Sequence, residues 1–486
     1  MRETLRQLET KRRGVLALKE RLRWIIKPSI RMLPPELLSR VFYECWRDGY
    51  ALRKRGTRSL SEQPNCRTTL TLSQVSAQWR ALISQQPLLW SHIRIEIQRD
   101  DTSKFAESIL EFTKFCLEKS GTTLLIIHFH IPVQGSDKYD QTLHKPILAE
   151  LFKHCQRWRG AVVNVHDEDV ISFPDELPNL RMLVLRRASS SVQSPITLRP
   201  VRTPRLHTLN ISRMGGLLSS FQDVRALETL STGESDSDII LGVLKRSPAL
   251  RKVTLIPDMW ISDPDTTEDP IILRLESLDI CHSMDCILPW LTLPCLRSLR
   301  IHHKDEYHLF NSRKLLDFLR RSQPPLDFLE LSGVELEPRQ LTLIFHLLPS
   351  ISVLHYNDNR PFTFHGQRYI SPHATKDFIE MITSSATSPS DGVLLPNLTH
   401  LSLSLTSAGD SRSSWHGSGM VPPSFFGEGS IIVDMVESRL AGLGGERKLQ
   451  RFKIECYESL LGREARDRLE RLKSQGLDID IQHRSY

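Results

Sequence analysis

The sequence predicts an α/β protein in which a small all-helical segment near the N-terminus precedes a long, irregular array of parallel strands alternating with helices. Apolar residues recur at helical spacing between residues 32 and 92. Beyond them, a short Pro-x-Leu-x-x-Leu-x-Leu unit returns at intervals between 21 residues (Leu206 to Leu227) and 30 residues (Leu296 to Leu326). These patterns divide the 486 residues into an arm at 1–31, a helical module at 32–92 and a repeat region at 93–486.

The arm at 1–31 carries the charge of the whole chain. It holds ten Lys or Arg residues and three Glu residues, and 10 − 3 = +7 equals the formal net charge of the complete sequence. The remaining body is therefore neutral, so nucleic acid is not expected as a partner. Apolar residues at heptad-like spacing predict a helix here, which either is solvated, binds a partner or serves as a localisation signal.

Cysteine usage and hydropathy bear on the compartment. Eight cysteines are scattered without a CxxC pair, which is typical of reduced thiols in the cytoplasm or nucleus. Lys19, Glu20 and Arg21 interrupt the apolar runs of the arm, and no stretch approaches the roughly 20 apolar residues of a membrane span. We therefore expect a cytoplasmic or nuclear protein with no membrane partner.

The helical module begins at a pair of prolines. Pro34 and Pro35 suit a helix start, and the apolar residues that follow share one helical face: Leu37, Leu38, Val41, Phe42 and Cys45. After a polar, basic loop from 48 to 68, a second helical pattern runs through Leu72, Val75, Trp79, Leu82 and Ile83 and stops before Pro87. A module this small should leave apolar surface for a partner. The alternative is a helical cap that packs onto the next part of the chain.

The strings LPPELLSRVF from Leu33 and LSQVSAQWRALISQQPLLW ending at Trp90 resemble the F-box, although the connection between them is longer than in many F-boxes. The resemblance implies docking onto a Skp-family adaptor, and through it onto a cullin. The adaptor contacts that it implies are Leu33, Pro34, Leu37, Leu38, Val41, Phe42, Val75, Trp79 and Trp90.

Beyond Trp90, alternating and helical patterns succeed one another. Ile93, Ile95 and Ile97 alternate with polar neighbours and predict a strand. Further helices are predicted at 105–117 and 147–158, and further strands at 124–131 and 162–165.

The recurring unit then predicts one strand per copy. The copies start at Leu177, Thr203, Ala226, Ser247, Arg274, Leu293, Pro324, Leu348, Leu395 and Lys448. They resemble divergent leucine-rich repeats, which implies a solenoid whose parallel strands line one face. The alternative is an irregular α/β domain with leucines in phase by chance.

Two polar insertions, near 357–392 and 404–430, interrupt this array. The second contains Trp415, Phe425 and Phe426, so it is either a contact loop or a linker. The chain ends with predicted helices at 431–443 and 458–473 and predicted strands at 449–456 and 477–481.

No motif for bond chemistry stands out. The sequence has no GxxxxGK[ST], and the glycines at 442–445 are typical of a helix end. Cys281, His282, Cys286 and Cys295 lack the knuckle spacing of zinc ligands. The histidines His128 and His130 share one strand face and are expected to be satisfied or exposed. We expect no catalytic, cofactor or metal site, and no enzyme.

The function expected from these patterns is that of a substrate receptor in an SCF-type ubiquitin ligase. The helical module would bind the adaptor, and the repeat region would recruit a protein target that the sequence does not name. One alternative is an F-box and repeat scaffold that acts outside any ligase. Another is a nucleic-acid or membrane-surface binder driven by the basic arm.

Overall fold

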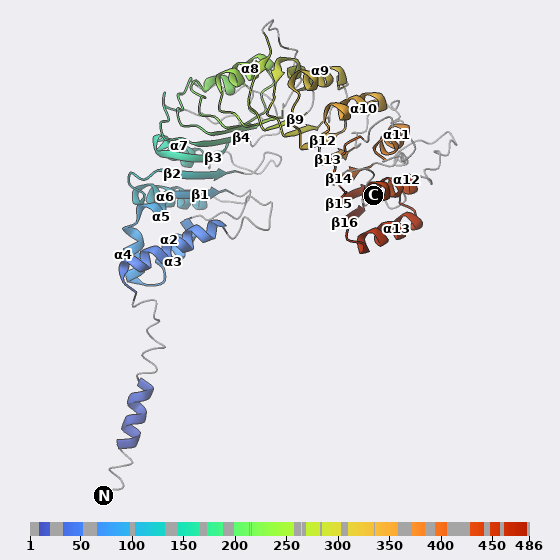
Figure 1. The fold of residues 1–486 in the computed structure, drawn as a ribbon. Coiled ribbons are helices and arrows are strands. Elements are labelled where there is room, and N and C mark those ends of the chain that lie inside the picture. The colour runs from blue at the N-terminus through green and yellow to red at the C-terminus, as the bar shows by residue number, and fades with distance from the viewer. Residues whose placement is uncertain are drawn as a thin grey trace, which may run out of the picture. The chain divides into compact units, whose positions relative to one another are not determined.

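The protein combines helices and parallel strands, so the α/β class predicted from the sequence is confirmed (Figure 1). The computed structural model describes residues 9–19, 33–51, 66–97, 103–131, 144–165, 173–187, 199–212, 214, 216–256, 264, 269–281, 284–302, 310–334, 336–357, 372–383, 394–405, 428–441, 448–456 and 461–483. The chain divides into two compact units, Met1–Asn164 and Val165–Tyr486. Within the described residues, no helix is long and apolar enough to cross a membrane.

Residues 9–19 of the arm form a helix, as predicted. All of its side chains are exposed, including those of Val15, Leu16 and Leu18. The rest of the arm lies outside the described residues.

Four helices follow in the first unit: α2 (Pro35–Ala51), α3 (Cys66–Ser73), α4 (Ala77–Ser84) and α5 (Pro87–Trp90). The polar loop predicted to start at residue 48 starts later, because α2 continues to Ala51. The single helix predicted through Leu72 and Ile83 is wrong, since α3 and α4 are separate helices. Ser76 caps the new helix by accepting a hydrogen bond from the Trp79 amide at 3.2 Å.

The remainder of the first unit is three parallel strands with helices between them. β1 (His92–Glu96) pairs with β2 (Leu125–His130), which pairs with β3 (Trp158–Val165). Helix α6 (Ser103–Lys119) ends two residues before Gly121, whose positive φ of 53° suits glycine. The helix predicted at 147–158 is shorter than expected, because α7 (Lys145–Phe152) gives way to a 3₁₀ turn, η4 (Cys155–Arg157), before Trp158 starts β3.

The second unit contains a long parallel sheet in which the strands lie in sequence order. Its members are β4 (Met182–Arg187), β5 (Thr208–Ser212), β6 (Thr229–Thr232), β7 (Lys252–Leu255), β9 (Ser277–Cys281), β11 (Ser298–His302), β12 (Phe328–Ser332), β13 (Val353–Asn357), β14 (His400–Ser404), β15 (Arg451–Cys456) and β16 (Asp478–His483). Each copy of the recurring unit contributes one of these strands, so the strand predictions are confirmed. A separate parallel pair is formed by β8 (Ile271–Ile272) and β10 (Leu291–Thr292).

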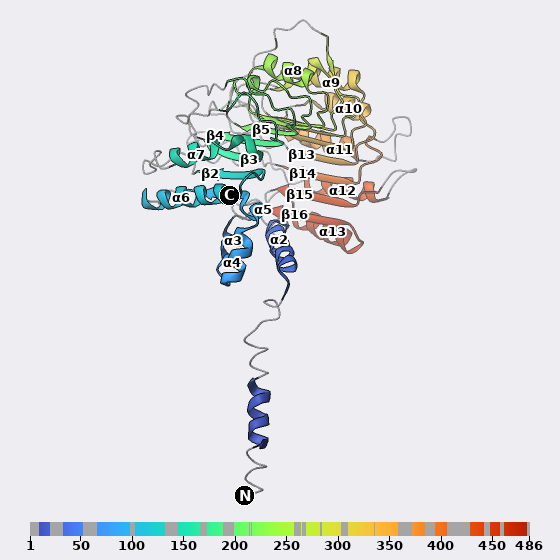
Figure 2. The ribbon, with the colours of Figure 1, turned by 90° about the vertical axis from the view of Figure 1, so that its left-hand side faces the viewer.

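Helices cover one face of this sheet (Figure 1, Figure 2). They are α8 (Ser237–Arg246), α9 (Ser312–Ser322), α10 (Pro338–Leu347), α11 (Pro372–Ile382), α12 (Glu428–Ala441) and α13 (Arg463–Ser474), with 3₁₀ segments η5 (Leu218–Ser220) and η6 (Met284–Trp290). Alternate strand residues such as Leu299 and Ile301 are buried, whereas Arg300 between them is half-buried. The leucines of the recurring unit therefore form the core between sheet and helices.

The predicted insertions fall mostly outside the described residues. The first contains α11, a helix that the sequence patterns did not predict. Of the second, only residues 404–405 and the start of α12 at 428–430 are described.

Candidate docking surface on the N-terminal helices

Helices α2 and α4 share a small aromatic core. Phe42 is fully buried and Trp79 is 6% exposed, and their ring centroids lie 4.7 Å apart at an interplanar angle of 60°. Leu38, one turn before Phe42, is also fully buried. The ring contact between Phe42 and Trp79 therefore joins α2 to α4.

The closing segment Pro87–Trp90 is held in place by contacts with α3, α4 and α6. The Trp90 indole Nε1 donates to the Ile83 carbonyl at 2.9 Å, and its ring meets Phe115 of α6 edge-on at 5.2 Å. The Thr69 hydroxyl donates to the Leu89 carbonyl at 2.9 Å. Trp90 is only 1% exposed, so it belongs to the interior of the first unit.

A polar contact ties the start of α2 to the same segment. The Gln86 side-chain amide donates to the Ser39 hydroxyl. Because Gln86 immediately precedes Pro87, this bond joins α2 to the junction between α4 and α5. The relative positions of the three helices are therefore held by both apolar and polar contacts.

Several apolar side chains on these helices remain in solvent. Leu37 is 49% exposed, Val75 46% and Leu88 45%, while Tyr43 is 36% exposed and stacks on Trp46. Fully burying a leucine or valine contributes roughly 1.5–3 kcal/mol, so covering the exposed half of each would contribute about 1 kcal/mol. The helices thus offer apolar area that a partner protein would cover favourably.

The structure separates the nine residues predicted to contact an adaptor. Leu38, Phe42, Trp79 and Trp90 lie in the interior, Pro34, Leu37 and Val75 are exposed, and Leu33 and Val41 are intermediate. Sequence reasoning missed Leu88 and Tyr43. Leu88 lies in the closing Pro-Leu-Leu-Trp segment that the sequence analysis singled out. The sequence does not distinguish it from its neighbour Leu89, which is buried.

The far end of α2 packs on the first strand. Trp46 meets the ring of His92 at 5.9 Å, and His92 lies 5.2 Å from His128 of β2. Burial is the main cause that lowers the pKa of His92 to about 3, and the nearby His128 and Arg94 contribute to the same shift. His128 has a pKa of about 4 for the same leading reason, with Arg94 as second cause, so both rings are neutral near neutral pH.

The histidines, cysteines and glycines considered as reactive sites in the sequence lie outside α2–α5. The His130 ring forms a hydrogen bond with the Asn164 side chain at 2.7 Å, and His130 is exposed at the end of β2. The prediction that this histidine is satisfied or exposed is confirmed. Cys281 ends β9, Cys286 is buried in η6 and Cys295 is exposed, while His282 and the glycines at 442–445 lie outside the described residues. The arrangement on α2–α5 is suited to binding a protein.

Comparison of the chain with models of known protein families, and with curated proteins, found no match.

Proposed function

We propose that this protein is a substrate receptor of an SCF-type ubiquitin ligase, in which α2–α5 dock onto a Skp-family adaptor and the second unit recruits a protein target. The adaptor would join the receptor to a cullin, and the receptor would carry out no bond chemistry itself. Such a receptor acts in the cytoplasm or the nucleus.

One observation carries the proposal. The helices α2–α5 hold themselves together through Leu38, Phe42 and Trp79, and still leave Leu37, Val75 and Leu88 about half exposed. Three such side chains on one group of short helices provide apolar area that a second protein would bury. The helices α2–α5 therefore have a buried apolar core of their own and additional apolar side chains in solvent, which favours docking of a second protein.

The test is the double substitution Leu37→Ala with Val75→Ala. Both side chains are exposed, so folding stability should change by less than about 1 kcal/mol. Loss of their apolar contacts should weaken co-elution with a purified Skp-family adaptor at least about tenfold, which corresponds to about 1.4 kcal/mol. Size-exclusion chromatography with titrated adaptor measures this.

The matched control is Leu343→Ala on α10, whose side chain is 45% exposed in the second unit. It should leave co-elution unchanged. Leu38→Ala is unsuitable as the primary test, because Leu38 is fully buried and its loss would disturb folding. Wild-type co-elution of the double variant contradicts the proposal. Adaptor binding without any cullin in the purified complex would instead indicate a scaffold outside the ligase.

A further inference from the structure

A small groove lies in the second unit on the side of the helices. One wall is a stripe of α8 that consists of Asp238, Leu241, Gly242 and Lys245. The opposite wall contains Asp269, Ile271 of β8 and Trp290 at the end of η6. Spacings of three, four and seven residues place the α8 side chains on one face of the helix, over about 10 Å.

The volume of the groove limits the kind of ligand that fits into it. Its volume is about 190 Å³. Sites for cofactors and drug-sized ligands occupy roughly 300–1,000 Å³, so this groove is too small for one. It suits one or two side chains of another protein.

Gly242 supplies an independent indication. It sits inside α8, where glycine costs about 1 kcal/mol relative to alanine. A Cβ built on Gly242 meets no heavy atom within 4 Å, so packing within the described part of the chain gives no reason for glycine at this position. The bare backbone instead gives a partner side chain close access to the floor of the groove.

Charge and exposure define the chemistry of the partner. The groove has apolar walls from Leu241, Ile271 and Trp290, and the adjoining Ile272 is 72% exposed. Two carboxylates, Asp238 and Asp269, face it with one ammonium group, that of Lys245. The lining therefore favours an apolar side chain that is flanked by a basic residue.

We propose that this groove on α8 binds a segment of a protein partner in which an apolar anchor residue stands next to a basic residue. The inference rests on the proposed function in that the partner would be the recruited target. It places recognition on the helix-covered side of the second unit, at Gly242, and leaves the adaptor surface free.

The test measures binding of a labelled amphipathic peptide of leucine and arginine to the full chain by fluorescence anisotropy. A control peptide carries glutamate in place of arginine. The arginine peptide should bind at least about tenfold more tightly. Equal binding of the two peptides, or no binding of either, would overturn the inference.

Two variants locate the binding. The Cβ of Gly242→Leu has free space, the rest of the side chain extends into the groove, and leucine improves helix propensity, so the variant should fold and should lose the arginine peptide. Lys245→Glu adds a carboxylate to the lining, so it should bind the arginine peptide more tightly without tighter binding of the glutamate peptide, whereas misfolding would raise binding of both.

Unchanged binding in Gly242→Leu, or weaker binding in Lys245→Glu, would overturn the inference. Self-association of the chain that Gly242→Leu abolishes would also overturn it, in favour of a second copy as the occupant. Adaptor co-elution of both variants should equal that of wild type. Failure of the peptide test would therefore leave the adaptor proposal standing, and failure of the adaptor test would leave the groove to be judged by the peptide alone.

Discussion

Arg439 shows how a single buried side chain organises two neighbouring elements. It is 2% exposed and lies in α12. Its guanidinium donates to the carbonyls of Ile382, Leu394 and Leu395 at 2.8, 2.6 and 3.0 Å. Ile382 is the last residue of α11, so Arg439 satisfies acceptors at that helix end and in the segment leading to β14.

We predict that Arg439→Met destabilises the protein. Methionine fills much of the volume but leaves buried carbonyls without donors, which should cost roughly 2–4 kcal/mol of unfolding free energy. Urea unfolding followed by circular dichroism measures the change. The control Arg463→Met, at an exposed position on α13, should change stability by less than about 0.5 kcal/mol. Equal stability of the two variants would contradict the role assigned to Arg439.

Leu395 adds a second residue-scale feature to the same segment. It has a positive φ of 55° although it is not glycine, and its side chain is 1% exposed. Such a backbone conformation costs roughly 1–2 kcal/mol for an ordinary residue. Burial of the leucine and the Arg439 hydrogen bond to its carbonyl together offset this strain.

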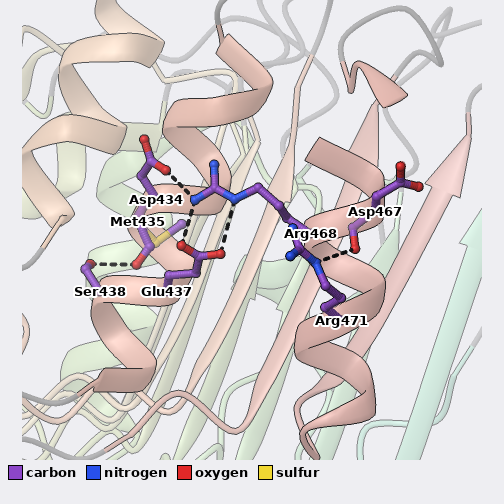
Figure 3. Close-up of polar contacts among 7 residues, drawn as sticks. All are labelled: Asp434, Met435, Glu437, Ser438, Asp467, Arg468 and Arg471. Atoms are coloured by element: carbon purple, nitrogen blue, oxygen red, sulfur yellow. Dashed lines mark hydrogen bonds and ion pairs between the residues drawn. The ribbon is translucent and has the colours of Figure 1, made fainter. Parts of the chain in front are cut away.

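At the scale of elements, α12 and α13 are joined by an ion-pair cluster (Figure 3). Arg468 of α13 donates to Asp434 at 2.6 Å and to both carboxylate oxygens of Glu437 at 2.6 and 3.2 Å. The hydrogen bonds to Glu437 and Asp434 raise the pKa of Arg468 above its ordinary value. Because Asp434 is 56% and Glu437 42% exposed, solvent screens much of this attraction.

We therefore predict a modest, salt-dependent contribution from this cluster. Arg468→Met should lower stability by about 1 kcal/mol or less at about 0.1 M salt, and the loss should shrink at about 1 M salt. Arg471→Met is the matched control, because Arg471 donates to the Asp467 carbonyl of its own helix (Figure 3). Thermal unfolding of both variants at the two salt concentrations measures the effect. A loss that is independent of salt would show that packing, not charge, is responsible.

At the scale of the whole molecule, the strand positions were the most predictable feature. The units starting at Leu177 and Leu293 place leucines at alternating positions, and these residues became β4 and β11 because alternate side chains must enter the core. The break between α3 and α4 was not predictable from periodicity, since Val75 and Trp79 keep helical spacing across a turn. It depends on the cap that Ser76 forms.

The candidate sites were only partly predictable. Leu37 and Leu38 look alike in the sequence, but a rotation of about 100° per helical residue puts one in solvent and the other in the core. The groove at Gly242 joins α8 to residues that lie far from it in sequence, so no local pattern indicates it. The acceptors of Arg439 likewise come from two other segments.

The histidines His92 and His128 predict that the two units respond differently to acid. Their pKa values in the folded protein are about 3 and about 4, below the value of 6.5 for an exposed histidine, chiefly because both rings are largely removed from solvent. At pH values between the folded pKa of each histidine and 6.5, the unfolded chain binds more protons than the folded chain. The stability contributed by the neutral rings is therefore complete above about pH 6.5 and decreases as the pH falls towards 4, by up to about 1.4 kcal/mol per pH unit for each group.

Hydrogen exchange of the full chain at about pH 7.5 and about pH 4.5 tests this. After correction for intrinsic exchange rates, protection of β1 and β2 should fall at the lower pH, while that of β11 and β12 should fall less. His92→Phe keeps an aromatic ring next to Trp46 but cannot titrate, so it should reduce the pH dependence of β1 and β2. His346→Phe, at an exposed position on α10, should leave that dependence unchanged. An identical pH profile for wild type and His92→Phe would show that the buried histidine pair does not set the acid sensitivity of the first unit, because the proton uptake of the unfolded chain would then come from other groups.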